Sequence, residues 1–189
     1  MRAIIKIIVI FILLQGCTYA VRYDSDYRGR VIDADTGEPI EGMVVLGTWY
    51  NEYSGVAGAV HTFYDARETV TDKNGEFSIP GIGITNVTPM DILIFKTGYE
   101  YDSGSWEGLK KSSFYKKKIK WEGNKAIIPL RKLTMEERKK QLGNFSPPGE
   151  APKEKVILML KEIEKDNKEL APHFKGRVPW GGKPLIQSP

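Results

Sequence analysis

The pattern of apolar and polar positions along the chain predicts a protein built mainly of β-strands. Several short segments are rich in β-branched and aromatic residues, which suit a pleated sheet. In residues 76–79, Phe77 and Ile79 alternate with two polar residues, so one face should be buried. The run Ile92–Phe95 is apolar throughout, which is typical of a central strand buried on both faces. The predicted strands are residues 27–32, 43–50, 64–71, 76–79, 91–96 and 126–131.

Turn-forming residues separate these strands. Residues 33–39 combine carboxylates that cap turns with a glycine and a proline. The sequence Asn74-Gly75 predicts a tight hairpin turn, because both residues tolerate positive φ. Pro129 predicts that the strand over residues 126–131 lies at a sheet edge. The remaining segments are predicted as a loop or weak strand (51–62), a connection (80–89) and a loop (100–108).

Helical patterns follow the last strand. Thr134 and Glu137 form a capping box that begins a short helix ending near residue 142. After a proline-rich linker at residues 146–152, a second helix is predicted over residues 153–170. We expect its apolar stripe to pack on the β-structure, with a partner-binding helix as the alternative. This stripe consists of Val156, Ile157, Leu160, Ile163 and Leu170.

The first strand and turn resemble the carboxypeptidase regulatory-like domain, a transthyretin-like fold. The matching positions are Gly29, Val31, Asp33, Thr36, Gly37, Pro39, Ile40, Gly42 and Val44, with Met43 where the family usually has alanine. Later motifs of that family are matched by Thr69, Thr71, Asp72, Gly75, Phe77, Gly98 and Tyr99. The resemblance implies a transthyretin-like antiparallel β-sandwich over residues 27–133, with an α-helical extension over 134–171 and an extended or disordered tail over 172–189. It implies little about activity, because fold and function separate.

The N-terminal residues indicate export. Arg2 and Lys6 are followed by the apolar run Ile7–Leu14, which is shorter than the about 20 residues that span a bilayer and suits a signal peptide over residues 1–16. The sequence Leu14-Gln15-Gly16-Cys17 resembles a bacterial lipobox, which implies a lipid anchor on Cys17 and a tether over residues 17–26. The alternative is an ordinary signal peptide with an unrelated cysteine. Because Thr18 follows the cysteine rather than aspartate, the resemblance implies the outer membrane if the host is Gram-negative.

Composition changes this picture only slightly. Cys17 is the only cysteine, so no intrachain disulfide is expected. The net charge of +4 includes Arg2 and Lys6, so the mature chain carries +2, which argues against a nucleic-acid partner. Residues 110–125 contain seven lysines and one glutamate. These lysines predict either contact with an anionic surface or protection of an edge strand from pairing. The lysines proposed for the anionic surface are Lys116, Lys117, Lys118 and Lys120.

Catalytic and metal motifs are not evident in the sequence. His61 and His173 lie outside any zinc-binding motif, so we expect no enzyme, no cofactor and no metal. A site that joins His61 to Asp65 and Glu68 is a minor alternative. The acidic turns at residues 33–38 and 72–76 could suggest calcium, although turn capping explains them better.

Aromatic residues then remain as candidate ligand contacts. A platform for a glycan or another ligand could be formed by Trp49, Tyr50, Tyr53, Tyr101 and Trp106, with filling of the core as the alternative. The sequence therefore predicts a non-catalytic, lipid-anchored binding or structural module of the cell envelope. Its expected partner is another envelope component, which the C-terminal helix could contact. The alternatives are glycan or peptidoglycan binding and an accessory domain of an envelope hydrolase.

Overall fold

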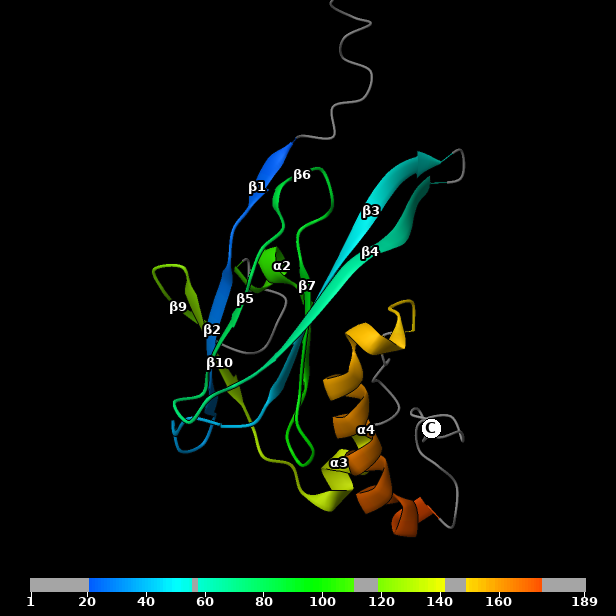
Figure 1. The fold of residues 1–189 in the computed structure, drawn as a ribbon. Helices are drawn as coiled ribbons and strands as arrows, with labels where there is room; N and C mark the ends of the chain where they lie inside the picture. Colours follow the sequence, from blue (N-terminus) through cyan, green and yellow to red (C-terminus); the bar gives the residue numbers. More distant parts are fainter. Residues whose placement is uncertain (1–20, 56–57, 111–118, 142–148, 175–189) are drawn as a thin grey trace, which may run out of the picture.

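The computed structural model describes residues 21–55, 58–110, 119–141 and 149–174. In this part of the chain two four-stranded sheets face each other, and a C-terminal helix packs on the outside of one of them (Figure 1). The predicted β-sandwich with a C-terminal helical extension is therefore confirmed.

The first sheet joins the beginning of the sandwich to its end. β2 runs antiparallel to β5, whereas β10 runs parallel to β2 and antiparallel to β9. Pro129 lies inside this sheet rather than on an edge strand, which corrects the prediction. The proline is tolerated because β9 pairs only with residues 125–127 and has ended before it. The strand order is β5 (Glu76–Ile79), β2 (Tyr27–Asp33), β10 (Lys125–Leu130) and β9 (Lys120–Glu122).

The second sheet is antiparallel and contains the two longest described strands. β3 and β4 pair along their whole length with a bulge between Trp49 and Tyr50, so residues predicted as a loop or weak strand extend the ribbon. β7 lies between β3 and β8, which confirms the prediction of a central strand. The strand order is β4 (Gly58–Val70), β3 (Val44–Gly55), β7 (Asp91–Phe95) and β8 (Asp102–Ser105).

The two predicted turns connect the sheets to each other. Residues 34–43 lead from β2 in the first sheet to β3 in the second, and residues 71–75 lead from β4 back to β5. The Asn74-Gly75 turn is present, with Gly75 at φ 73°, but the strands it joins belong to different sheets. Gly75 is also tightly enclosed, since a Cβ there would lie 2.3 Å from the carbonyl oxygen of Val31.

A small third ribbon joins the first described strand of the chain to the segment between β5 and β7. β1 (Arg22–Asp24) pairs antiparallel with β6 (Gly83–Thr85), and Tyr23 lies opposite Ile84. The prediction of a tether over residues 17–26 is corrected for the described part, because β1 is an ordered strand. The sequence signal was weak, since three residues are too few to establish an alternating pattern.

Apolar side chains from both sheets fill the space between them. Val31 and Ile79 from the first sheet and Val45 and Ile94 from the second are buried in one continuous cluster. The cluster also takes in the short helix α2 (Trp106–Lys110), which lies where a loop was predicted. This cluster is the main hydrophobic core of the protein.

The C-terminal helix forms a second core on the outer face of the second sheet. Val44, Leu46 and Phe95 point away from the first sheet and pack against Met159 and Ile163 of α4 (Ile157–Leu170). The predicted packing of the apolar stripe is therefore confirmed, although Ile157 itself is exposed. The flanking helices are α3 (Met135–Gln141), η2 (Lys153–Lys155) and η3 (Ala171–Phe174).

The predicted capping box is present at the start of α3. The backbone N–H of Thr134 donates to Glu137 at 2.9 Å, and the N–H of Glu137 donates to the Thr134 hydroxyl at 3.4 Å. Within the described residues, no helix is long and apolar enough to cross a membrane.

Candidate functional site

Two of the five aromatic residues proposed as a ligand platform are buried in the core. Trp49 is 0% exposed and Trp106 is 4% exposed. Tyr27 joins them through edge-to-face contacts, with ring centroids 6.1 Å from Trp49 and 5.4 Å from Trp106. Trp106 also meets Trp121 at 5.4 Å. This burial corrects the hypothesis for Trp49 and Trp106, whose rings fill the sandwich.

The other three aromatic residues lie apart from one another. Tyr50 makes an edge-to-face contact with Phe63 at 6.5 Å, and Tyr53 is exposed farther along β3. Tyr101 is partly buried in the second core, beside α4. The structure therefore does not bring the five residues together into one platform.

The residues proposed for lipidation and for anionic contacts are mostly outside the described chain. Cys17, Lys116, Lys117 and Lys118 belong to this group. Lys120 is exposed on β9, the edge strand of the first sheet, where a lysine discourages pairing with another chain.

A buried carboxylate that the sequence analysis did not single out organises one end of the sandwich. The side chain of Asp24 is fully buried and forms an ion pair with Arg22 at 2.8 Å. It also accepts hydrogen bonds from the indole N–H of Trp49 at 2.9 Å and from the backbone N–H of Ile82 at 3.1 Å. The hydroxyl of Tyr27 donates to its other oxygen. Asp24 is thus the acceptor at the centre of a polar cluster that links three separate segments.

This Asp24 cluster holds the β1–β6 ribbon on the sandwich. The guanidinium of Arg22 donates to the carbonyl oxygens of Thr88 at 2.8 Å and Val87 at 3.2 Å, beyond the end of β6. Gly81 allows its backbone to lie close to the backbone of β1, because a Cβ at this position would lie 2.2 Å from the carbonyl oxygen of Asp24. A polar cavity of about 190 Å³ adjoins the cluster.

The hydroxyl of Tyr27 is held as a donor within the Asp24 cluster. Burial raises the pKa of Tyr27, and the hydrogen bond to Asp24 and the charge of that carboxylate raise it further. The phenol is therefore held in its neutral, donating form. The only sequence signal for this cluster was the alternation of the charged residues Arg22 and Asp24. It was missed because the three residues of β1 lie in a polar stretch that was predicted as a tether.

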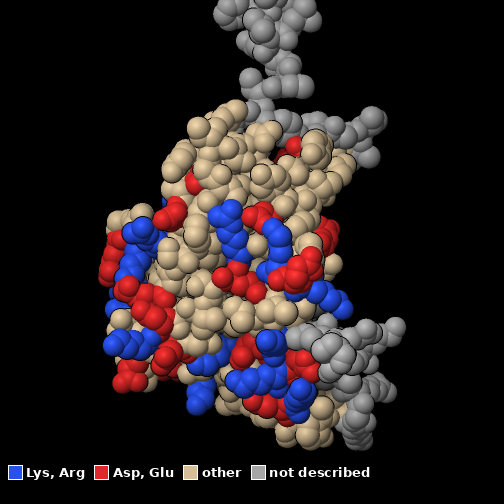
Figure 2. All heavy atoms as spheres, viewed as in Figure 1, with Lys and Arg blue, Asp and Glu red and all other residues tan. Residues whose placement is uncertain are grey.

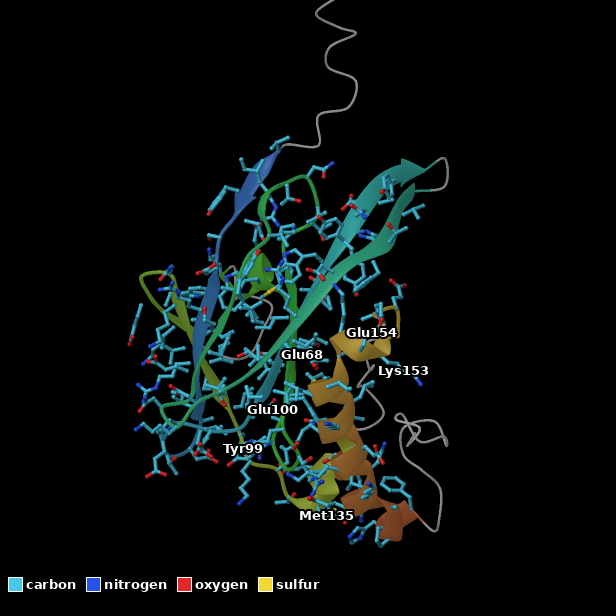
Figure 3. All side chains as sticks on the ribbon, viewed as in Figure 1. Glu68, Tyr99, Glu100, Met135, Lys153 and Glu154 are labelled. Atoms are coloured by element: carbon cyan, nitrogen blue, oxygen red, sulfur yellow. The ribbon has the colours of Figure 1, made fainter. Side chains whose placement is uncertain are left out.

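The minor alternative of a site joining His61, Asp65 and Glu68 is not assembled. His61 is exposed on β4 opposite Glu52, whereas Glu68 faces α4 (Figure 3). Asp65 forms ion pairs with Arg67 at 3.2 Å and with Lys155. Two of the three candidate groups are thus engaged in holding the C-terminal helix.

Glu68 caps α4 from outside the helix. Val156 at the N-cap position has no side-chain oxygen, and the carboxylate of Glu68 accepts from the N–H groups of Leu158 at 2.9 Å and Met159 at 2.7 Å. These are the donors that an N-cap side chain normally satisfies. Burial raises the pKa of Glu68 and outweighs the opposite effect of the two N–H groups.

Asp65 behaves differently from Glu68. Burial alone would raise its pKa, but the hydrogen bond from Lys155, the N–H of Ala66 and the charges of Lys155 and Arg67 together lower it. Asp65 is therefore the stable anionic partner of η2, while Glu68 serves the first turn of α4.

The two acidic turns considered for calcium serve the backbone. Asp33 accepts from the N–H groups of Asp35 at 2.9 Å and Thr36 at 3.0 Å, and these bonds lower its pKa. Asp72 accepts from the N–H groups of Asn74 and Glu76, which likewise lower its pKa. No group of three or more side chains suited to a metal occurs among the described residues.

The outer face of the first sheet offers an open groove of about 590 Å³. No described helix packs on this face, in contrast to the outer face of the second sheet (Figure 1). Charges of both signs line the groove, and an ion pair between Lys125 and Glu76 crosses it. The polar residues along it include Arg28, Glu76, Ser78, Glu122 and Lys125.

Comparisons with known proteins identify no family. No protein-family model and no curated protein match the sequence. Among solved structures, a 3-chlorocatechol 1,2-dioxygenase from Rhodococcus opacus 1CP is similar over 59% of this chain and 61% of its own, with 19% identity and a TM-score of 0.35. A 9R-lipoxygenase from Cyanothece PCC8801 is similar over 59% of this chain but only 14% of its own, with 12% identity and a TM-score of 0.23. The matched region thus covers less than two thirds of either protein.

Proposed function

We propose that this chain is a lipid-anchored cell-envelope protein whose β-sandwich serves as a non-catalytic binding or structural module. The observation that carries the proposal is the small number of residues in the sequence between Cys17 and β1. Arg22 follows Cys17 by five residues and is fixed to the sandwich through Asp24. Five extended residues span at most about 17 Å, so a lipidated Cys17 would hold the sandwich against the membrane surface.

The roles of the acidic side chains support a module without catalysis. Asp65 and Glu68 stabilise the C-terminal helix, and Asp24 is enclosed by its own donors. The groove on the first sheet supplies an open polar face for another envelope component. Glycan binding through aromatic loops loses much of its support, since Trp49 and Trp106 belong to the core.

Replacement of Cys17 tests the proposal directly. The wild-type chain and Cys17→Ser would be produced in a bacterial host that is fed a labelled fatty acid, with Thr18→Ala as the matched control. We expect label and membrane fractionation for the wild type and for Thr18→Ala, because only a cysteine can be acylated in this way, and loss of both for Cys17→Ser. Equal fractionation and no label in all three chains would contradict the lipid anchor.

A further inference from the structure

Two ribbons project from the end of the sandwich at which the described chain begins (Figure 1). One is β1–β6, and the other is the outer part of β3–β4, beyond the region where β3 pairs with β7. Their bases are adjacent, because the backbone N–H of Thr88, just after β6, donates to the carbonyl oxygen of Tyr50 at 2.9 Å. We call these two ribbons the N-terminal end.

Each ribbon of the N-terminal end carries an exposed pair of large side chains. On β1–β6, Tyr23 lies directly opposite Ile84, and these residues are 74% and 80% exposed. On β3–β4, Tyr53 lies opposite Val60, and these are 53% and 52% exposed. Cross-strand neighbours share one face of a ribbon, so each ribbon presents a tyrosine beside an aliphatic side chain to its surroundings.

The N-terminal end is also poor in charge. Residues 53–64 and 80–90 contain no lysine, arginine, aspartate or glutamate, although these types make up 28% of the whole chain. Figure 2 shows the contrast: the end that bears β1 and β6 is largely tan, the colour of uncharged residues, whereas blue and red side chains crowd the rest of this face. The exposed carboxylate of Glu52 marks the border on β3.

We propose that the N-terminal end sits in the interfacial region of a lipid bilayer, with these two pairs among the lipid headgroups. This inference rests on the proposed lipid anchor and extends it to a defined protein surface. Tyrosine prefers the boundary between headgroups and acyl chains, and the neighbouring aliphatic side chains gain from burial there. Charged side chains would oppose such contact, and this end has few of them.

The short segment between Cys17 and β1 favours the membrane over a protein as the partner of the N-terminal end. The five residue steps from Cys17 to Arg22 reach at most about 17 Å, which is roughly half the about 30 Å width of a small domain. Another folded protein would therefore have little room between the N-terminal end and the bilayer. Exposed apolar side chains that gather at one end of a protein mark an interaction surface, and here the nearest partner is lipid.

Fluorescent labelling of single cysteines tests this orientation in the intact lipoprotein. Acylation consumes the thiol of Cys17, so Ile84→Cys or Val60→Cys introduces a single free thiol at an exposed position. Lys73→Cys is the matched control, because it lies in the turn at the opposite end of β4. Each protein would be purified from membranes, labelled with a polarity-sensitive dye and reconstituted in vesicles of phosphatidylethanolamine and phosphatidylglycerol with brominated acyl chains.

We expect a blue-shifted emission and quenching by the brominated lipids at positions 84 and 60, and neither change at position 73. An aqueous, unquenched signal at either position 84 or position 60 would overturn the inference. A blue shift without lipid quenching would also overturn it, since a protein would then cover this end. Failure of the lipid anchor itself is distinguishable, because the intact mass of the purified protein would then lack the acyl chains.

Discussion

Replacement of Asp24 by asparagine should destabilise the protein more than any other change of one carboxylate to an amide at this end. Asparagine keeps the shape of the side chain but turns one of its two acceptor oxygens into a donor. Asp24 forms an ion pair with Arg22 and accepts hydrogen bonds from Tyr27, from Trp49 and from the N–H of Ile82, so every one of its partners is a donor. An amide at this position leaves at least one of these donors facing another donor.

The magnitude follows from the burial of the cluster. A hydrogen bond to a charged group contributes about 1.5–3 kcal/mol, and removal of one partner from a buried ion pair costs about 3–5 kcal/mol. The amide retains the bonds on its carbonyl side, and the guanidinium of Arg22 is partly exposed and can be hydrated. We therefore expect Asp24→Asn to lower the free energy of unfolding by about 2–4 kcal/mol, a large part of the about 5–15 kcal/mol of a typical domain.

Equilibrium unfolding in urea, followed by tryptophan fluorescence, measures this loss. Trp49 donates to Asp24, so its emission in the folded state should change as well. Asp26→Asn is the matched control: it lies two residues away, and its exposed carboxylate pairs with Arg28 at 3.4 Å, so a change within about 0.5 kcal/mol is expected. Equal unfolding midpoints for the two variants would refute the view that Asp24 holds the β1–β6 ribbon.

Two further predictions concern the C-terminal helix. Glu68→Ala should lower the free energy of unfolding by about 0.5–2 kcal/mol through loss of the cap on α4, whereas Glu68→Gln keeps an acceptor and should cost less. Burial raises the pKa of Glu68 in the folded state, so the folded state binds the proton more tightly than the unfolded state does. The stability of the wild type should therefore fall relative to that of Glu68→Gln as the pH rises from 4.5 through the raised pKa. Urea titrations at several pH values that show no such difference would contradict this assignment. Ile163→Ala should cost about 2–5 kcal/mol in thermal or urea unfolding, because Ile163 is buried against the second sheet, whereas Ile157→Ala on the exposed side of the helix should cost far less.

The sequence predicted the sandwich because its core strands repeat a strong local pattern. The alternation at Phe77 and Ile79 and the run Ile92–Phe95 each correspond to an observed strand with the expected burial. The capping box at Thr134 was predictable for the same reason, since all its parts lie within four residues. Local signals of this kind need no knowledge of the tertiary fold.

The polar contacts that join distant segments were not predictable. Asp24 meets Trp49 and Ile82 only after both sheets have formed, and Glu68 lies 90 residues before the helix N–H of Leu158 that it caps. The same limitation affected the aromatic residues. Whether Trp49 faces a ligand or the core depends on which side of β3 meets the first sheet, and aromatic composition alone does not specify that side.

The parallel pairing of β2 with β10 has a consequence for the order of folding. Val31 lies beside Ile128, so the strand that opens the sandwich is completed by the strand that closes it. During synthesis, the first sheet lacks its second central strand, β10, until nearly the whole sandwich sequence is available. Closing so long a loop costs entropy that grows slowly with length, by about 0.6 kcal/mol for each doubling, and such non-local pairings fold slowly. The architecture thus favours a chain that remains unfolded until its last strand arrives.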